Sequence, residues 1–231
     1  MVDQKTLTVD IGGSGIKAMV LDSKGDPIRR RKRVSTPRPA KPDPVLGAIV
    51  KLAKKHLDFD RVSVGFPGVI RKGVTETAVN LHKDWAGFNL EKALSKKLDK
   101  PVRVLNDADV QGFGAISGKG VELVVTLGTG FGSALFLDGK LVPNLEVAHH
   151  PFHNGRTYEE HLGSAALGKA GRKKWQRRVM EAIESLEHLF NYDTLYIGGG
   201  NARRLTFDLP TNVKIIPNVA GLLGGIALWR D

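Results

Sequence analysis

Two glycine-rich turns in this chain have the composition of phosphate-binding loops. Each follows a short apolar run, and Gly128 in the second turn stands 116 positions after Gly12 in the first. Glycine lets the backbone approach anionic oxygens closely, with successive N–H groups directed at the anion. A tight hairpin turn that needs positive φ explains either turn taken singly. Two related turns can instead grip one phosphate chain together, so the pair predicts phosphate chemistry.

Three side chains near these turns suit phosphoryl transfer. Asp10 directly precedes the first turn, where a carboxylate can hold Mg²⁺, directly or through water, against phosphate oxygens. Aspartate is also a common turn former, which is the alternative at this position. Thr129, within the second turn, can donate a hydrogen bond to the transferred phosphoryl group. Lys17 is a further candidate, although its depth in the following strand leaves its reach to phosphate open.

Asn106 and Asp107 lie where a predicted strand ends and a predicted helix begins. Open α/β sheets place ligand contacts at this position, and one carboxylate here could take a proton from a substrate hydroxyl. Phosphoryl transfer needs little more from a protein than positioning, charge neutralisation and such a base. Either residue could instead cap the helix expected over Ala108–Ser117. The spacing alone leaves both interpretations open.

Polar loop residues elsewhere could read a polyhydroxylated ligand through fixed hydrogen bonds. They are Asn80, His82, Glu146, His149, His150, His153, Glu159, Glu160 and His161. Four of the histidines lie within 13 residues, but their spacing matches no standard zinc pattern and the chain has no cysteine. We therefore predict no zinc site, with most of these histidines hydrogen-bonded in loops.

The elements that must position these residues form two similar halves. We expect strands at Leu7–Asp10, Gly15–Leu21, Pro27–Val34, Arg61–Gly65 and Val102–Leu105, with helices at Val45–His56 and Asn89–Leu98. The second half repeats the opening with strands at Glu122–Leu127, Gly132–Leu137 and Lys140–Val142. It continues with helices Tyr158–Leu167 and Lys173–Phe190, strands Leu195–Ile197 and Val213–Ile216, and a helix from about Gly221.

The two halves align as copies of one strand-turn-strand unit. Ala18–Asp22 and Ala134–Asp138 match position for position behind the paired glycines Gly12 and Gly128. The sequence therefore predicts two α/β lobes around a central cleft, over residues 1–106 and 107–231. The last helix is the element that could pack back on the N-terminal lobe.

Composition limits the classes of protein that this chain can belong to. Its 231 residues are 41% hydrophobic, enough for one large or two small domains, and the absence of cysteine excludes disulfides and thiolate metal sites. No apolar run approaches the roughly 20 residues of a membrane span, and the N-terminus does not resemble a signal peptide. We expect a soluble, cytoplasmic protein with no membrane partner.

A formal net charge of +11 suggests a polyanionic partner, although a basic excess can also be solvated surface. The charge is partly concentrated in Arg29–Arg33 and Arg172–Arg178. No nucleic-acid-binding motif accompanies it, so we expect no nucleic-acid partner.

Taken together, the motifs resemble the ROK family of sugar kinases in the actin-like (ribonuclease H-like) ATPase superfamily, and most closely its polyphosphate glucokinase branch. The resemblance covers nearly the whole chain. It is carried by Asp10–Lys17, Gly65–Val69, Asn80–Trp85, Asn106–Ala108, Leu127–Ser133, Glu146–His149, Tyr158–Glu160 and Tyr196–Asn201.

The resemblance implies specific roles for these residues. Asp107 would be the general base on the sugar 6-hydroxyl, and Asp10 would serve Mg²⁺. The sugar would also be bound by Gly68, Asn80, Asn106, Glu146, His149 and Glu159. The donor would be bound by Asp10, Gly12, Gly13, Ser14, Lys17, Gly128, Thr129, Gly130, Gly199 and Gly200.

The family implies a cytoplasmic homodimer that phosphorylates glucose from inorganic polyphosphate, with ATP as a second donor. The basic residues Arg172–Arg178 and Arg203–Arg204 are candidates for a polyphosphate track. A kinase that uses only ATP on glucose, mannose or another hexose is one alternative, and a sugar sensor without catalysis is another.

Two departures from the family pattern stand near the sugar residues. Many members carry a cysteine-rich zinc motif where this chain has His153–Arg156, which again predicts no zinc. The glycine of the family's Glu-x-Gly-His segment is Ala148 here, which puts the geometry of Glu146 and His149 in question. Family repressors carry a DNA-binding helical domain before the first loop, and we expect none before Asp10.

Overall fold

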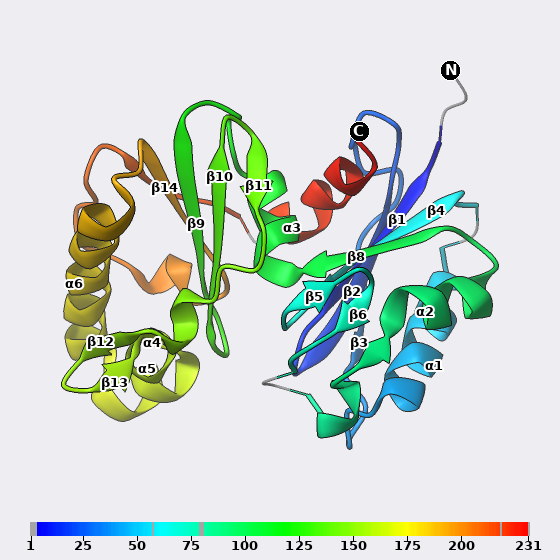
Figure 1. Cartoon of the computed structure of the whole chain (residues 1–231), viewed down its shortest axis with the longest axis horizontal. Helices are drawn as coiled ribbons and strands as arrows, with labels where there is room; N and C mark the ends of the chain where they lie inside the picture. Colours follow the sequence, from blue (N-terminus) through cyan, green and yellow to red (C-terminus); the bar gives the residue numbers. More distant parts are fainter. Residues whose placement is uncertain (1–3, 57, 79–80, 218, 231) are drawn as a thin grey trace. The chain divides into compact units, whose positions relative to one another are not determined.

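The computed structural model describes residues 4–56, 58–78, 81–217 and 219–230 (Figure 1). Its internal contacts separate two compact units. Unit 1 comprises Met1–Gly114 and Val219–Asp231, and unit 2 comprises Ala115–Asn218. The chain therefore enters unit 2 from unit 1 and returns to unit 1 for its last residues.

Unit 1 is built on a five-stranded sheet, as far as the chain is described, with the order β3-β2-β1-β4-β8. The strands are β1 (Thr6–Ile11), β2 (Gly15–Leu21), β3 (Lys32–Ser35), β4 (Arg61–Phe66) and β8 (Val102–Asn106). β1 runs antiparallel to β2 and parallel to β4, which is parallel to β8. The carboxyl ends of β1, β4 and β8 therefore lie at one edge of the sheet.

The two faces of this sheet differ in chemistry because side chains alternate along each strand. Leu7, Val9 and Val64 belong to an apolar core that includes buried residues of α1 (Pro42–Ala53) and α2 (Leu90–Leu98). The opposite face carries Thr8 of β1 and Ser63 of β4. Polar side chains therefore gather on the face turned away from α1 and α2.

Helix α3 (Asp107–Phe113) and the C-terminal elements α7 (Ala220–Leu223) and η4 (Gly224–Trp229) cover this polar face. A Cβ on Gly225 would lie 2.3 Å from Thr8 Cγ2, so this close approach requires glycine. Trp229 donates its Nε1–H to Ser63 Oγ at 2.8 Å, and the Arg61 and Arg103 guanidinium carbons lie 4.9 and 4.6 Å from its ring centre. The end of the chain is thus anchored on unit 1.

Unit 2 repeats the same sheet order with β11-β10-β9-β14-β15. The strands are β9 (Val121–Leu127), β10 (Phe131–Leu137), β11 (Lys140–Val142), β14 (Thr194–Gly198) and β15 (Val213–Ile215). Leu123, Val125 and Leu127 share a core with buried residues of α4 (Tyr158–Leu162) and α6 (Arg172–Phe190). The predicted repeat of the strand-turn-strand unit is present at the level of topology.

A buried carboxylate stabilises the loop with which unit 2 begins. Glu122 accepts hydrogen bonds from the amides of Ser117, Gly118 and Lys119, and from the Tyr196 hydroxyl. Burial works to raise the pKa of Glu122, but these hydrogen bonds outweigh it and hold the pKa below its usual value.

The remaining elements are short and connect the two sheets to their helices. They are β5 (Ile70–Arg71), β6 (Val74–Thr75), η1 (Lys83–Trp85), β7 (Phe88–Asn89), η2 (Val147–His149), β12 (Pro151–His153), β13 (Arg156–Thr157), α5 (Ser164–Ala170) and η3 (Ala202–Arg204). Within the described ranges, no helix is both long and apolar enough to cross a membrane.

The boundary between the units differs from the one expected after Asn106. Helix α3 packs on β4 and against α7 and η4, so it belongs with unit 1. The contact is intimate, because a Cβ on Gly224 would lie 1.8 Å from the Val110 carbonyl oxygen. The C-terminal elements α7 and η4 also belong to unit 1, because they pack against α3, β1 and β4. Amphipathic spacing along a helix does not say which sheet the helix covers.

Three further elements differ in extent from the expectation. The third strand is limited to Lys32–Ser35, with only an isolated bridge from Pro27 to Leu21 before it. The helix expected over Tyr158–Leu167 is broken at Gly163, where a Cβ would lie 2.9 Å from the Thr129 carbonyl oxygen. Helix α3 ends at Phe113, since the amides of Ser117 to Lys119 are bound by Glu122 instead.

Candidate active site

Asp10 and Lys17 form an ion pair at the start of the first glycine turn. They are cross-strand partners on β1 and β2, and Lys17 Nζ donates to Asp10 Oδ2 at 2.7 Å. Both side chains are partly shielded, with 19% of Asp10 and 31% of Lys17 exposed. Lys17 is therefore directed to the carboxylate beside the turn, and its contact with phosphate stays a prediction.

Asp107 starts helix α3 on the same face of the sheet as Asp10. Gly65 is the partner of Asp10 in the parallel β1–β4 pair, so a side chain at Gly65 would point to the same side. A Cβ placed there would lie 3.3 Å from Asp107 Cα and 3.6 Å from its Cβ. Gly65 thus makes room for Asp107, one strand away from Asp10.

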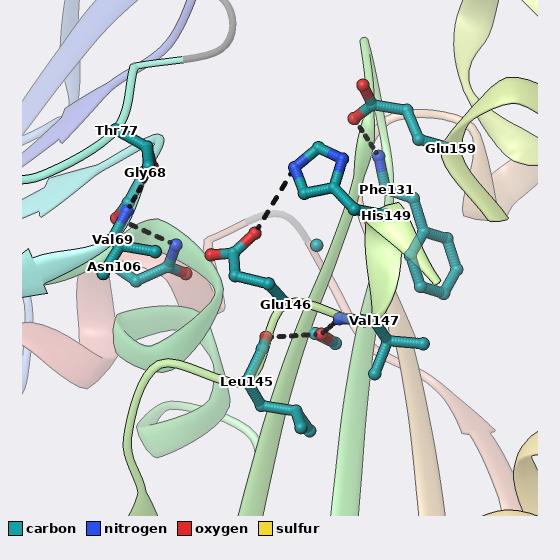
Figure 2. A network of polar contacts seen from close by, with 12 residues as sticks. Gly68, Val69, Thr77, Asn106, Phe131, Leu145, Glu146, Val147, His149 and Glu159 are labelled. Atoms are coloured by element: carbon teal, nitrogen blue, oxygen red, sulfur yellow. Dashed lines mark hydrogen bonds and ion pairs between the residues drawn. The ribbon is translucent and has the colours of Figure 1, made fainter. Parts of the chain in front are cut away.

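Asn106 is the residue that caps helix α3. Its Oδ1 accepts from the Ala108 and Asp109 amides at 2.8 and 3.4 Å, and its Nδ2 donates to the Gly68 carbonyl oxygen at 3.2 Å (Figure 2). Asp107 follows at the first helical position, where its Oδ1 also accepts from the Ala108 amide at 2.9 Å. Of the two interpretations left open by the sequence, capping applies to Asn106.

The loop after β4 is held rigidly against its neighbour. A Cβ on Gly68 would lie 2.1 Å from the Thr77 carbonyl oxygen, so no other residue fits there. The next amide, of Val69, donates to Thr77 Oγ1 at 3.0 Å (Figure 2). The Gly68 carbonyl that receives Asn106 is therefore fixed in position.

The second glycine turn is held by its carbonyl groups. The Gly128 amide donates to the Gly130 oxygen at 3.1 Å, and the Gly128 oxygen accepts from Ser164 Oγ at 2.7 Å and Asn201 Nδ2 at 3.1 Å. Asn201 Nδ2 also donates to Ser164 Oγ at 3.0 Å. This network ties the turn to helix α5 and to the Gly198–Asn201 loop, while Thr129 is exposed.

Gly199 and Gly200 have different surroundings within that loop. Gly199 has φ +86°, and a Cβ there would lie 2.4 Å from the Leu127 oxygen, so glycine is required for packing. Gly200 is exposed, and a Cβ there would meet nothing within 4 Å. Gly200 is therefore the one of the pair that is open to a ligand.

Glu146, His149 and Glu159 form a polar group in unit 2. Figure 2 shows the His149 ring directed toward Glu146, with Nε2 3.9 Å from Glu146 Oε2. Glu159 Oε2 accepts from the Phe131 amide at 3.2 Å, which joins this group to the end of the second turn. Burial raises the pKa of Glu146; the charge on His149 opposes the rise and the Glu159 carboxylate adds to it. Ala148 is buried in the short η2 helix between them.

Comparison with known proteins identifies the family of this chain. The family model described as the ROK family matches residues 6–150. The chain belongs to the ROK family. It is 32% identical over 233 residues to the polyphosphate glucokinase of Mycobacterium tuberculosis, a match that covers 94% of this chain and 88% of that protein.

Two solved structures of similar proteins have the same fold. The inorganic polyphosphate/ATP-glucomannokinase of Arthrobacter sp. strain KM matches with a TM-score of 0.89 and 33% identity, over 97% of this chain and 98% of that one. A ROK family glucokinase from Streptomyces griseus, in complex with glucose and AMPPNP, matches with a TM-score of 0.81 and 20% identity over the same shares. The α/β fold class of the actin-like ATPases is thereby confirmed.

Several polar residues near the ROK motifs serve the local structure instead. Glu160 forms a capping box with Thr157 at the start of α4, and His82 accepts from the Asp84 amide at 3.2 Å. His161 contacts the His153 carbonyl oxygen at 3.0 Å. Across the described residues, no three His, Cys, Asp or Glu side chains are grouped to hold a metal ion. Asn80, expected to bind the sugar, lies outside the described residues.

Two arginines at the first turn were not predicted as site residues, although Arg33 belongs to the basic cluster Arg29–Arg33. Arg33 and Arg38 donate to the Ser14 and Gly13 carbonyl oxygens at 3.2 and 2.9 Å. The signal that could have found Arg33 is the hairpin register, because it pairs with Lys17 across β2 and β3. The third strand was expected over Pro27–Val34, and those bounds did not predict the pairing of Arg33 with Lys17.

Proposed function

We propose that this ROK protein is a polyphosphate glucokinase, which transfers a phosphoryl group from inorganic polyphosphate to the 6-hydroxyl of glucose. ATP serves as a second donor. The observation that carries the proposal is Asp107, held over Gly65 beside the Asp10–Lys17 pair in a chain with this degree of similarity to polyphosphate glucokinases. The runner-up, a hexokinase that uses ATP alone, differs in the donor and not in the base.

Asp107 acts as the general base. Its carboxylate takes the proton of the 6-hydroxyl as the oxygen attacks the terminal phosphorus, and the bond from phosphorus to the bridging oxygen of the donor breaks. Asn106 is fixed by the Gly68 carbonyl and orients the neighbouring sugar hydroxyls. Positioning of the hydroxyl, together with a single carboxylate, is enough for this reaction class.

Asp10 suits Mg²⁺ in the manner usual for phosphoryl transfer. The ion commonly keeps several waters and is held by one or two carboxylates plus substrate phosphates, so a preformed cluster of ligands is not needed. Asp10 is one carboxylate beside the first turn, and Lys17 donates a hydrogen bond to one of its two oxygens. When bound, Mg²⁺ neutralises charge on the donor phosphates. Asp10 would hold it directly or through water.

The sugar hydroxyls are bound by Glu146, His149 and Glu159 of unit 2, together with Gly68, Asn80 and Asn106 of unit 1. The raised pKa of Glu146 lets its carboxyl keep a proton at higher pH than an exposed glutamate does. A protonated carboxyl can donate as well as accept a hydrogen bond. This group is therefore suited to hydroxyls, which also do both.

The donor is bound by the two glycine turns and by Gly200, with part of the predicted basic track. Arg172, Lys173 and Arg177 line a cavity of about 630 Å³ on unit 2. Arg178 donates to Glu181 Oε2 at 2.7 Å, so its charge is already paired. Arg172 donates to the Arg204 oxygen at 2.9 Å, which holds Arg203–Arg204 beside α6. Arg177 is thus a better candidate for polyphosphate than Arg178.

The oligomeric state and the place of action follow from the same proposal. We infer a homodimer in the cytoplasm, where glucose, ATP and polyphosphate are available to a kinase.

A panel of donors tests the proposed function. Glucose phosphorylation is measured with ATP, short polyphosphate and long polyphosphate at two salt concentrations. We expect activity with polyphosphate that weakens as salt rises, because binding of a polyanion releases counterions. Activity with ATP alone would establish the runner-up.

Asp107→Asn supplies the complementary test of the base. A positioned general base contributes about 10²–10⁴-fold, so kcat should fall by that range with every donor while glucose still binds. Turnover that is unaffected in this variant would overturn the assignment of Asp107. No turnover in the wild-type protein, with glucose binding intact, would identify a sugar sensor.

A further inference from the structure

We propose that Arg33 and Arg38 form a second, side-chain layer of the donor site, which binds phosphate units of polyphosphate beyond the one transferred. The proposal rests on the proposed function and names the part of the chain that distinguishes polyphosphate from ATP. It is carried by the contacts of the first glycine turn with β3 and the segment that follows it.

Arg33 lies directly across the first turn. It pairs with Lys17 between β2 and β3, and its Nη2 donates to the Ser14 carbonyl oxygen at 3.2 Å. A Cβ on Gly15 would lie 2.5 Å from both Nε and Nη2 of this guanidinium. The Arg33 guanidinium therefore lies directly over Gly15.

Arg38 and Thr36 complete the contact from the same segment. Arg38 Nη2 donates to the Gly13 oxygen at 2.9 Å, and Thr36 Oγ1 donates to the Gly12 oxygen at 2.5 Å. Three successive carbonyls of the turn, at residues 12 to 14, thus accept hydrogen bonds from this one segment. Thr36 is buried, whereas both arginines are exposed.

This arrangement leaves donors available on the turn. The Gly12 amide is bonded to the Gly15 oxygen at 3.0 Å, whereas the amides of Gly13 and Ser14 have no acceptor among the described residues. Each guanidinium has five N–H donors, of which the turn takes one. Backbone amides and two exposed guanidinium groups therefore stand beside one another, with Lys17 on the same face as Arg33.

A linear phosphate chain is the ligand that uses all of these groups. Planar guanidinium groups match phosphate oxygens with paired hydrogen bonds, and they are always charged. ATP places a nucleoside where polyphosphate continues with about one negative charge per unit. Arginines beyond the transferred group are therefore of more use to polyphosphate than to ATP.

The test compares two double variants with equal loss of charge. R33Q,R38Q removes the two guanidinium groups at the turn and leaves uncharged polar side chains in their place. R30Q,R31Q is the matched control, because Arg30 and Arg31 are exposed in the same basic segment and have no contact with the turn among the described residues. Kinetics are measured with tripolyphosphate, long polyphosphate and ATP, alongside thermal unfolding.

We expect R33Q,R38Q to raise KM for long polyphosphate about tenfold or more, with less effect on tripolyphosphate and less than about threefold on ATP. The slope of log KM against log salt should fall by about two, one for each phosphate contact. R33K,R38K should recover part of the loss. R30Q,R31Q should change KM for polyphosphate by less than about threefold.

Equal effects of R33Q,R38Q on ATP and polyphosphate would overturn the proposal, because they would mean that the arginines only support the turn. Equal effects of the two double variants would also overturn it, since they would indicate general attraction to positive surface. A wild-type protein that phosphorylates glucose from ATP but neither uses nor binds polyphosphate would overturn this proposal and the proposed donor together.

Discussion

The two glycine turns look alike in sequence, yet the residue pairs beside them differ in charge. In unit 1, Lys17 faces Asp10 across the hairpin and forms an ion pair with it. In unit 2 the residue at the position of Asp10 is Thr126, and the residue facing it is Gly132, whose amide donates to the threonine hydroxyl at 3.1 Å. The first turn is therefore charged and the second is neutral.

The difference comes from the length of the turn. Four residues separate the paired Ile11 and Ile16, but only three separate Leu127 and Phe131. Since side chains alternate along a strand, one residue fewer moves the whole return strand to the opposite face. Two copies of one unit have thus acquired different roles without losing their topology.

Ser133 illustrates this change of face. It stands where Lys17 stands in the first copy, but its partner is Val125, and its hydroxyl donates to the Leu145 oxygen at 2.8 Å. It serves the interior of unit 2. The two return strands align position for position in sequence, but their pairing with the preceding strand differs in register by one residue.

Removal of the carboxylate in the first turn should have the largest effect. Asp10→Asn should lower kcat/KM by about 100-fold or more with either donor, because loss of the proposed Mg²⁺ ligand would leave the developing charge less well stabilised. The matched change in the second turn, Thr126→Val, should cost less than about tenfold. Steady-state kinetics over a range of Mg²⁺ concentrations provides the measurement. Similar losses in both variants would contradict the division into a charged and a neutral turn.

The next effect should come from the cation. Lys17→Met leaves Asp10 partly shielded and without its partner, so kcat should fall by roughly tenfold, with excess Mg²⁺ restoring part of it. Ser133→Ala removes a buried hydrogen bond and should lower the free energy of unfolding by about 1–2 kcal/mol with unchanged kinetics. Urea unfolding and steady-state kinetics on both variants separate the two roles. A kinetic defect in Ser133→Ala, with none in Lys17→Met, would contradict the assignment of Lys17 to catalysis and Ser133 to stability.

A comparison within unit 2 should give a smaller effect, on stability. Gly199→Ala introduces a side chain at φ +86° and 2.4 Å from the Leu127 oxygen, so the free energy of unfolding should fall by about 2 kcal/mol or more. Gly200→Ala meets no atom within 4 Å and should change it by less than about 0.5 kcal/mol. Thermal and urea unfolding test both. If Gly200→Ala also raises KM for the donor, that glycine faces the ligand.

The smallest effect should appear as a pH dependence that distinguishes the two units. His56 of unit 1 is fully buried, and burial lowers its pKa below 6.5, with the positive charges of Lys32 and Arg29 adding to the effect. The unfolded chain then binds the proton more readily, so this stability is present above pH 6.5 and is lost as the pH falls below it.

Glu122 of unit 2 loses its contribution in a more acidic window. Its folded pKa is also lowered, so that stability is present above about pH 4.5 and lost below it.

Urea unfolding of wild type and His56→Leu between pH 5 and 8 is the measurement. The variant should be less dependent on pH between 5 and 7. An unchanged slope would mean that His56 does not titrate there.

Much of the fold and the catalytic face could be predicted from the sequence. Glycine turns, hairpin residues and strand composition are local properties, so the paired turns and the positions of Asp10 and Asp107 followed from them. The family supplied the sugar-binding residues. The separation of Asn106 as cap from Asp107 as candidate base required the geometry of the helix start, because both residues suit either role.

Register and packing partners could not be predicted in this way. The one-residue difference between the turns depends on which pairs close each hairpin, and those pairs form between strands. Arg33 lies beside the first turn because of the register of β3 with β2, and Arg38 reaches the turn from the segment after β3. The side of the boundary on which α3 lies depends on close contacts with residues more than 100 positions away, such as Gly224.

The return of the chain to unit 1 has a consequence for its synthesis. Trp229 and Gly225 complete the polar face that carries Asp10 and Asp107, and they follow the whole of unit 2 in the sequence. On the ribosome, unit 2 can form as a local domain while unit 1 still lacks its final elements. The half that carries the proposed general base can therefore complete its fold only after unit 2 has been synthesised.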